Sequence, residues 1–337
     1  MLRAKLIDKS LVAENVIATD RSRCLRMRFN GNSCTRCTAI CPSGAITINE
    51  DVVINADNCS ACMLCVATCP ADCFALPGEN FNSVIGRLQK TRLSVPTPVL
   101  GCGTREDTVG HAKIHCLGSL SEAHLIALAV FLENGLQLDA TKCTGCWNGF
   151  ILEALKERIA GAEAGTSLEL LSRLKLIQNR DELDYREPSC GRRGFFSDLK
   201  MMTLRQAADL FAEDRSNVTM QSYSAKQVPF KKALLNRALK AVPGELQRPL
   251  LESYYYLVRA DEGCDSCFSC IGMCPTGALR IEEMEGTRGL FFSSSLCNAC
   301  GLCESFCRRG CISITKGFFG ENPFKFINIK RKLSCLS

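Results

Sequence analysis

Four cysteines between Cys264 and Pro275 constrain this chain more than any other stretch. They follow the spacing Cys-x2-Cys-x2-Cys-x3-Cys-Pro, so three thiols lie on one tight loop and a fourth follows shortly after. The same gaps recur at Cys59–Cys69 and at Cys297–Cys307. A further copy at Cys34–Cys41 keeps the last three cysteines and lacks the first at its usual place. Repetition of this kind indicates repeated structural units.

These runs resemble the cysteine motifs of bacterial ferredoxins with two [4Fe–4S] clusters. In that family the first three thiolates of a run bind one cluster, and the fourth reaches the neighbouring cluster. The resemblance therefore implies four clusters, whereas a zinc site would use a single pair of Cys-x-x-Cys knuckles. The implied ligands form four sets, which we call site A (Cys24, Cys34, Cys37, Cys69), site B (Cys41, Cys59, Cys62, Cys65), site D (Cys264, Cys267, Cys270, Cys307) and site E (Cys274, Cys297, Cys300, Cys303).

Cys24 is the nearest upstream candidate for the missing first ligand of the altered run. A longer loop to Cys34 can still close, because the entropy of loop closure grows slowly with length. The alternative is a three-ligand site that holds a [3Fe–4S] cluster or a labile iron. Cys73 and Cys311 each follow the last ligand of a run by four positions. We interpret them as small buried residues, because a cluster cannot use a fifth thiolate.

The middle of the chain contains four more cysteines that do not follow this spacing. We call them site C: Cys102, Cys116, Cys143 and Cys146. The pattern predicts a strand at 97–100, a helix at 119–133 and a strand at 136–139. This order resembles the thioredoxin-like [2Fe–2S] ferredoxins over residues 97–150, except that the last two cysteines are closer together here. A [2Fe–2S] cluster, a [4Fe–4S] cluster or zinc would fit four thiolates. A redox dithiol at Cys143 and Cys146, or plain structural cysteines, remain alternatives.

All three histidines lie in this region, at His111, His115 and His124, and we expect a structural role for each. Periodicity predicts helices at 148–162, 167–177, 198–213 and 230–241. Residues 190–196 resemble a twin-arginine export signal, but no apolar segment follows them, so we reject that role. Lys231 and Lys232 are expected on a solvated helix face. Residues 317–337 form a basic tail, expected to be a partner-binding arm or disordered, in which Cys335 is not a ligand.

The expected fold is α+β, with two ferredoxin-like modules flanking a small thioredoxin-like unit and a helical segment. The expected divisions are 1–80, 95–150, 151–250, 251–316 and the tail 317–337. No stretch reaches the roughly 18 apolar residues of a membrane span, and no signal peptide is visible. The 24 cysteines are grouped as metal ligands are, which indicates a reducing cytoplasmic compartment.

The formal charge of +6 counts the cysteines as neutral. Four oxidised [4Fe–4S] centres of about −2 each would bring it to about −2 (+6 − 8). Basicity therefore does not favour a nucleic-acid partner. The resemblance implies a polyferredoxin that passes single electrons between a donor and a partner oxidoreductase, more as a subunit than as a free-standing enzyme. An oxidoreductase whose site C is itself reactive is the main alternative, and a cluster-delivery factor is a weaker one.

Overall fold

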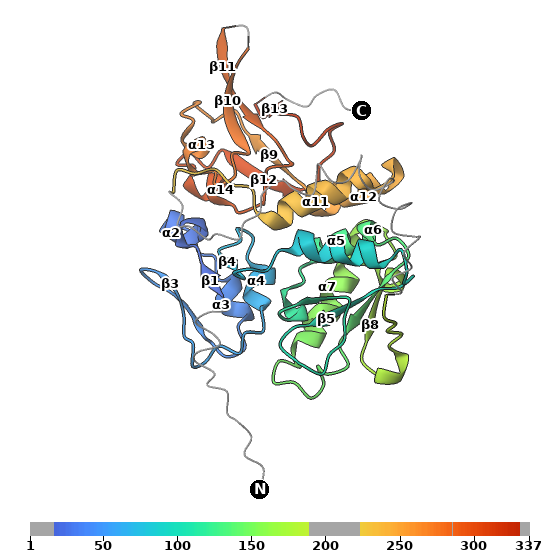
Figure 1. The fold of residues 1–337 in the computed structure, drawn as a ribbon. Helices are drawn as coiled ribbons and strands as arrows, with labels where there is room; N and C mark the ends of the chain where they lie inside the picture. The colour runs from blue at the N-terminus through green and yellow to red at the C-terminus, as the bar shows by residue number, and fades with distance from the viewer. Residues whose placement is uncertain (1–16, 189–222, 285, 331–337) are drawn as a thin grey trace.

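A computed structural model of the chain describes residues 17–188, 223–284 and 286–330. The fold is mixed α and β, in agreement with the α+β class expected from the sequence (Figure 1). An N-terminal cysteine-rich unit and a parallel-sheet unit lie side by side, and a C-terminal cysteine-rich unit lies above the N-terminal unit in the view of Figure 1. Cys190 and Cys335, and the helix predicted at 198–213, lie outside the described residues.

The N-terminal unit is built around two short helices and a hairpin. Helices α3 (Arg36–Ile40) and α4 (Leu64–Thr68) each carry cysteines, and the short turns η1 (Arg21–Arg23) and α2 (Leu25–Arg28) precede them. Strands β2 (Ile46–Ile48) and β3 (Val52–Ile54) form an antiparallel hairpin, in which a polar turn separates two apolar runs. Strand β1 (Ala18–Thr19) pairs with β4 (Phe74–Ala75), which brings the two ends of the unit together.

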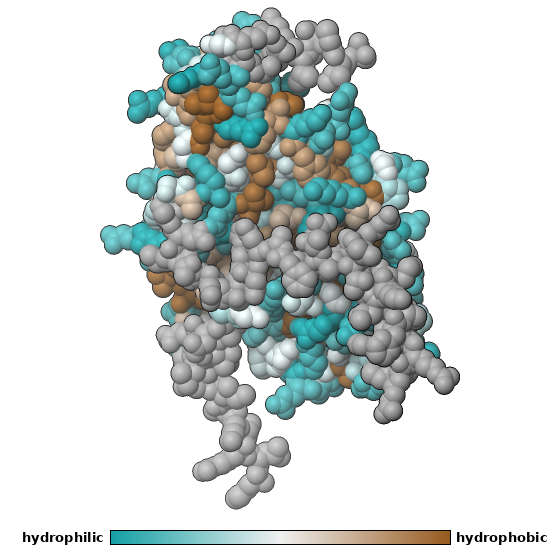
Figure 2. All heavy atoms as spheres, turned by 45° about the horizontal axis from the view of Figure 1, so that its top comes forward, coloured by the Kyte–Doolittle hydropathy of each residue, from teal (hydrophilic) through white to brown (hydrophobic). Residues whose placement is uncertain are grey.

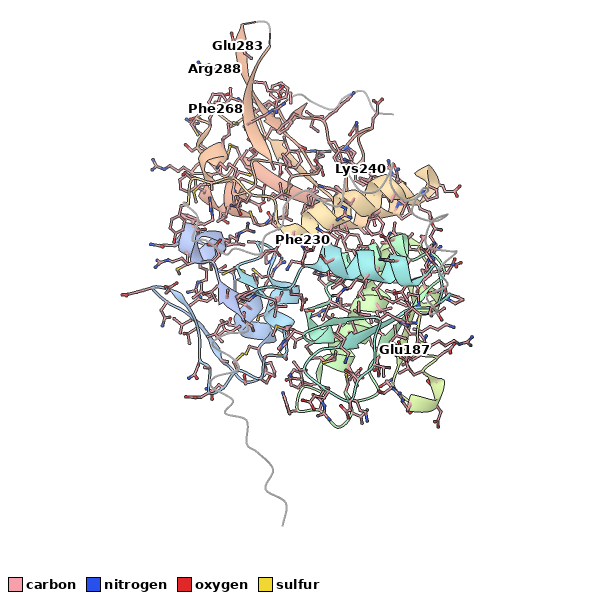
Figure 3. The ribbon with its side chains drawn as sticks, in the orientation of Figure 1. Glu187, Phe230, Lys240, Phe268, Glu283 and Arg288 are labelled. Carbon is pink, nitrogen blue, oxygen red and sulfur yellow. The ribbon has the colours of Figure 1, made fainter. Side chains whose placement is uncertain are left out.

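The C-terminal unit repeats this plan. Strand β9 (Tyr256–Ala260) pairs with β12 (Ile312–Lys316), as β1 pairs with β4. Helices α13 (Ser269–Met273) and α14 (Leu302–Phe306) flank the hairpin of β10 (Leu279–Met284) and β11 (Thr287–Phe292). This hairpin projects from the body of the molecule, with Glu283 and Arg288 near its tip (Figure 3). The internal repeat seen in the sequence is therefore a repeat of topology.

The region between them contains a four-stranded parallel sheet. Its elements are α5 (Phe81–Thr91), β5 (Val99–Cys102), β6 (Ala112–Ile114), η2 (Leu117–Ser119), α6 (Glu122–Phe131), β7 (Leu136–Asp139), α7 (Ile151–Thr166), α8 (Leu170–Arg173), β8 (Leu174–Ile177) and η3 (Arg180–Glu182). The strand order is β6-β5-β7-β8, and every pairing is parallel. The sheet thus continues beyond residue 150. The single helix predicted at 167–177 is wrong, because Leu174–Ile177 pairs with β7 as an extended strand.

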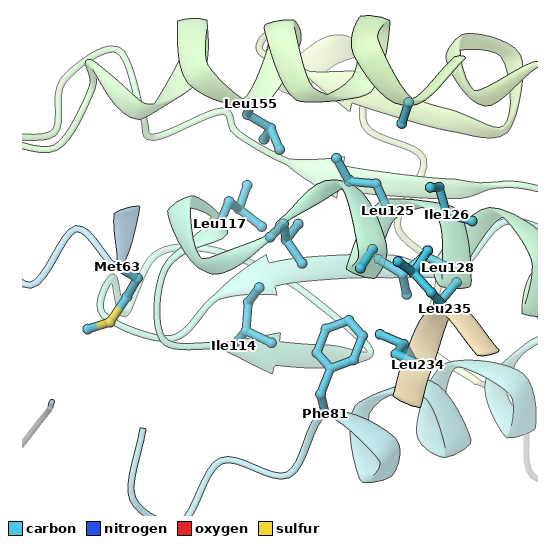
Figure 4. Packing of buried hydrophobic residues seen from close by; sticks show 14 of the residues in the cluster. Met63, Phe81, Ile114, Leu117, Leu125, Ile126, Leu128, Leu155, Leu234 and Leu235 are labelled. Carbon is cyan, nitrogen blue, oxygen red and sulfur yellow. The ribbon is translucent and has the colours of Figure 1, made fainter. Parts of the chain in front are cut away.

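Helices α11 (Phe230–Ala241) and α12 (Gly244–Tyr254) connect the units. The bounds of α11 match the predicted helix. It packs against α6, and α12 packs against α7. Phe230 lies where α11 meets α5 (Figure 3), and its ring is 6.4 Å from that of Phe81. One apolar core runs through the N-terminal unit, the parallel sheet and these helices (Figure 4), while most of the C-terminal unit has a core of its own.

Two expectations about polar segments are corrected. Lys232 is buried and Lys231 is largely buried, so neither lies on a solvated face. The described part of the tail is packed rather than free: Phe318 and Ile329 are buried, and β13 (Ile327–Asn328) pairs with β11. The face shown in Figure 2 is mainly hydrophilic, with hydrophobic residues in small groups. In the described part of the chain, no helix has both the length and the apolar character that crossing a membrane requires.

Candidate iron–sulfur sites

The three intact cysteine runs share one backbone shape. In each, the residue before the second cysteine and the residue after it have positive φ angles. They are Ala61 (53°) and Met63 (65°), Ser266 (59°) and Phe268 (57°), and Ala299 (54°) and Gly301 (75°). A left-handed conformation costs a non-glycine residue about 1 kcal/mol or more, so a repeated pattern reflects a shape that the surroundings impose. No residue between Cys34 and Cys41 is in this conformation, which separates the altered run from the others.

Site B forms a pocket in the described structure. Its four cysteines line one cavity together with the apolar side chains of Ile46, Ile54 and Leu64. Cys41 reaches this cavity from the preceding run, while Cys59 and Cys62 come from the loop before α4 and Cys65 comes from the first turn of α4. The backbone N–H of Ala45 also donates to Cys41 Sγ at 3.3 Å. Cys41 therefore lies beside the cysteines of the following run.

Electrostatic coupling between thiols shows that the members of site A lie together. The pKa of Cys37 rises to about 11, first because of burial and then because of the nearby thiolates of the three other site A cysteines. Those neighbours are Cys69, Cys24 and Cys34, in that order. Cys24 is buried and lies among these thiols, although it is farther from Cys34 in the sequence than the usual spacing.

The C-terminal unit gives the same grouping. Burial, followed by Cys264 and Cys267 and, more weakly, Cys307, raises the pKa of Cys270 to about 11. These are the members of site D. The pKa of Cys303 is also raised, by burial and then by the other site E cysteines, Cys297, Cys300 and Cys274. Both sites thus draw their fourth thiol from the other run.

Site C lies at the carboxyl edge of the parallel sheet. Cys102 ends β5, Cys116 follows β6, and Cys143 and Cys146 follow β7. All four line one pocket, which Thr104, Arg105, Thr108, Asp139, Lys142 and Asn148 also line. The order β6-β5-β7-β8 places a topological switch point between β5 and β7, where parallel sheets open a crevice for ligands. Burial, with Cys102 and Cys146 next, raises the pKa of Cys143 to about 11.

Among the described residues, no group of three or more His, Cys, Asp or Glu side chains is arranged to hold a single metal ion. The four cysteines of site B line one pocket, and those of site C line another. The raised thiol pKa values mean that any metal must displace protons when it binds.

The histidines have structural surroundings, and none lines the site C pocket. His111 Nδ1 accepts from the N–H of Val99 at 2.8 Å. His124 caps the start of α6 through a 2.7 Å contact between its Nδ1 and Ser121 Oγ. His115 Nε2 is a buried ring nitrogen with no hydrogen-bond partner in the described structure.

Side chains join neighbouring sites across the units. Asn148, two residues after Cys146 of site C, donates from Nδ2 to the backbone oxygen of Ser60 in the site B loop at 2.9 Å. Gly118 is packed so closely on the backbone oxygen of Cys62 that a Cβ would clash with it. Asn298, next to Cys297 of site E, donates to the oxygen of Pro70, next to Cys69 of site A, at 3.0 Å.

Two lysines of the connecting segment hold the ends of ligand helices. Lys231 Nζ donates to the backbone oxygens of Val66, Ala67 and Cys69 at the end of α4, and it pairs with Asp72 at 3.0 Å. Lys226 Nζ donates in the same way to Ile271, Gly272 and Cys274 at the end of α13. A cation at the carboxyl end of a helix is favourable because of the helix dipole. The sequence patterns carried no signal for these contacts.

Comparison with known proteins gives limited guidance. No protein-family model matches the chain. Over 65 residues the chain is 38% identical to DNA-directed RNA polymerase subunit Rpo3 of Methanosarcina mazei. This similarity covers 19% of the chain and 23% of the polymerase subunit, so the chain spans less than a quarter of that relative. Function must therefore be argued from the sites.

Proposed function

We propose that this protein is a multi-cluster iron–sulfur electron-transfer protein of the polyferredoxin type. The observation that carries the proposal is that cysteines from two different runs lie together at each of sites A, B, D and E. That exchange between runs is the ligand pattern of ferredoxin modules with two clusters. A zinc site would use a single pair of Cys-x-x-Cys knuckles and not two runs of four cysteines. Sites A, B, D and E would each hold a [4Fe–4S] cluster.

Site C would hold a fifth centre. Its four cysteines suit a [2Fe–2S] or [4Fe–4S] cluster, and zinc is the alternative. Bound clusters supply reversible one-electron chemistry, and the protein tunes their potentials through hydrogen bonds, charge and burial.

The contacts between units support a definite order of the centres. Asn148 links site C to site B, and Asn298 links site A to site E. Sites A and B share one unit, as sites D and E share the other. The proposed path therefore runs C–B–A–E–D, which differs from the order along the chain. Its two ends are the sheet edge at site C and the loop with Cys267, an exposed site D cysteine.

The partners we propose are redox proteins or subunits of a larger oxidoreductase complex in the cytoplasm. The partial similarity to a polymerase subunit makes nucleic-acid binding a worthwhile control, which we expect to be negative.

The deciding experiment measures iron, acid-labile sulfide and zinc per chain after anaerobic purification. About twenty iron atoms without zinc would fit five [4Fe–4S] centres, and about eighteen would fit a [2Fe–2S] centre at site C. About sixteen iron atoms with one zinc would make site C structural and leave the four-cluster path B–A–E–D. Zinc alone, with no sulfide, would refute the electron-transfer proposal.

A second candidate is an oxidoreductase with a reactive site C. The observation that favours it is the polar lining of that pocket, where Arg105, Lys142 and two threonines lie beside the cysteines. A cluster that reacts directly needs an open coordination position. Binding of a small anion or of cyanide that changes only the spectrum of site C would favour this candidate over simple transfer.

A further inference from the structure

Two cysteines outside the five sites occupy equivalent positions in the two cysteine-rich units. Cys73 follows Cys69 by four residues, and Cys311 follows Cys307 by four residues. Both are buried, with exposed fractions of 2% and 6%. The other two runs have Ala45 and Ala278 at this position. The extra thiol is thus associated with sites A and D and not with sites B and E.

Each extra thiol lies close to a ligand thiol of its site. At site A the side chains of Cys73 and Cys24 interact. At site D the thiol of Cys311 lies beside that of Cys307.

Each extra cysteine also reaches the last ligand of its site. The sulfurs of Cys311 and Cys307 are 3.4 Å apart. On the other side of the molecule, the backbone N–H of Cys73 donates to Cys69 Sγ at 3.3 Å. Ala45 makes the matching backbone hydrogen bond to Cys41 at site B. This backbone bond therefore also occurs where no extra cysteine is present, and only the additional thiol distinguishes site A from site B.

We propose that Cys73 and Cys311 are positioning residues whose S–H groups each donate a hydrogen bond to a ligand sulfur, that of Cys24 at site A and that of Cys307 at site D. This inference rests on the proposed function. A hydrogen bond to a ligand sulfur stabilises the extra negative charge of a reduced cluster and raises its reduction potential. Sites A and D would then have higher potentials than sites B and E. Along the path C–B–A–E–D, lower and higher potentials would alternate.

The test compares Cys73→Ala, Cys73→Ser and Cys311→Ala in the full-length holoprotein. Iron and sulfide are measured first, and the midpoint potential of each cluster is then followed by EPR during a redox titration. We expect full iron content and a more negative midpoint for one cluster in each alanine variant. The other clusters should keep their midpoints. Cys73→Ser retains a donor and should recover part of the shift.

Two results would overturn the inference. Loss of one cluster from Cys73→Ala would make Cys73 a ligand. Unchanged midpoints in fully loaded alanine variants would leave both cysteines as packing residues only. If the wild-type chain itself binds no iron–sulfur clusters, the proposed function fails, and that result is read from the wild-type protein alone.

Discussion

The amide of Asn298 donates to the backbone oxygen of Pro70 at 3.0 Å, across 228 positions of sequence. The two residues adjoin Cys297 and Cys69, which are ligands proposed for sites E and A. This hydrogen bond therefore joins the two cysteine-rich units directly beside two of the proposed ligands. Phe29 and Phe306 meet at the same junction, with ring centroids 5.3 Å apart.

Asn298→Ala should weaken this junction without removing a cluster. The loss of one intramolecular hydrogen bond should lower the free energy of unfolding by about 1 kcal/mol. Magnetic coupling between the clusters of sites A and E should decrease in EPR spectra of the reduced protein. Asn148→Ala, at the junction of sites C and B, is the matched control and should leave that coupling unchanged. Equal effects of both variants on it would contradict the proposed order of sites.

Cys24→Ala should convert or remove the cluster at site A. We expect the iron content to fall by about one atom per chain if a [3Fe–4S] cluster remains, and by about four if the cluster is lost. Iron analysis and the EPR spectrum of the oxidised protein distinguish these outcomes. Cys34→Ala should give a loss of the same kind. An unchanged iron content in Cys24→Ala would show that this residue is not a ligand.

Local patterns predicted those parts of the fold that depend on neighbouring residues in the chain. The strand at Leu136–Asp139 and the bounds of α11 are confirmed. Each depends on alternation or helical periodicity that a short window contains.

Contacts that depend on a distant partner were missed. Leu174–Ile177 has apolar residues that also fit a helix face, and only pairing with β7 makes it a strand. Helix α12 was not predicted, because Pro249 lies inside it and proline is unfavourable in a helix interior. The contacts that Cys311 and Asn298 make likewise exist only once the units have folded. The spacing of the cysteines within each run is local and can be read from the sequence, whereas the surroundings of these cysteines depend on the fold.

Lys231→Met should destabilise the protein strongly. Lys231 and Asp72 have side-chain exposures of 13% and 16%, so the substitution would leave a largely buried carboxylate without its cation. Breaking a buried pair in this way costs about 3–5 kcal/mol. Anaerobic thermal unfolding at pH 7 measures the loss. Lys226→Met is the matched control, because that lysine makes the same kind of backbone contacts at a more exposed position, and it should cost much less. Similar losses in both variants would argue against the ion pair as the cause.

His124 should make stability depend on pH. In the folded protein its pKa falls to about 3, mainly because of burial, with the positive charges of Lys231 and Arg158 adding to the shift and Asp72 opposing it. The pKa of an unfolded histidine is about 6.5. Between these values the unfolded chain binds a proton that the folded chain does not. Stability should therefore fall as the pH drops below about 6.5, by at most about 1.4 kcal/mol per pH unit.

His124→Gln should remove this dependence, because glutamine does not titrate. Unfolding measured anaerobically between pH 7 and pH 5 gives the slope for each protein. Ser121→Ala tests the alternative that the helix cap alone matters: it removes the hydroxyl partner at 2.7 Å and leaves the buried imidazole in place. That variant should be less stable at every pH and keep the wild-type slope. A wild-type slope in His124→Gln would assign the pH dependence to other groups, such as the cluster ligands.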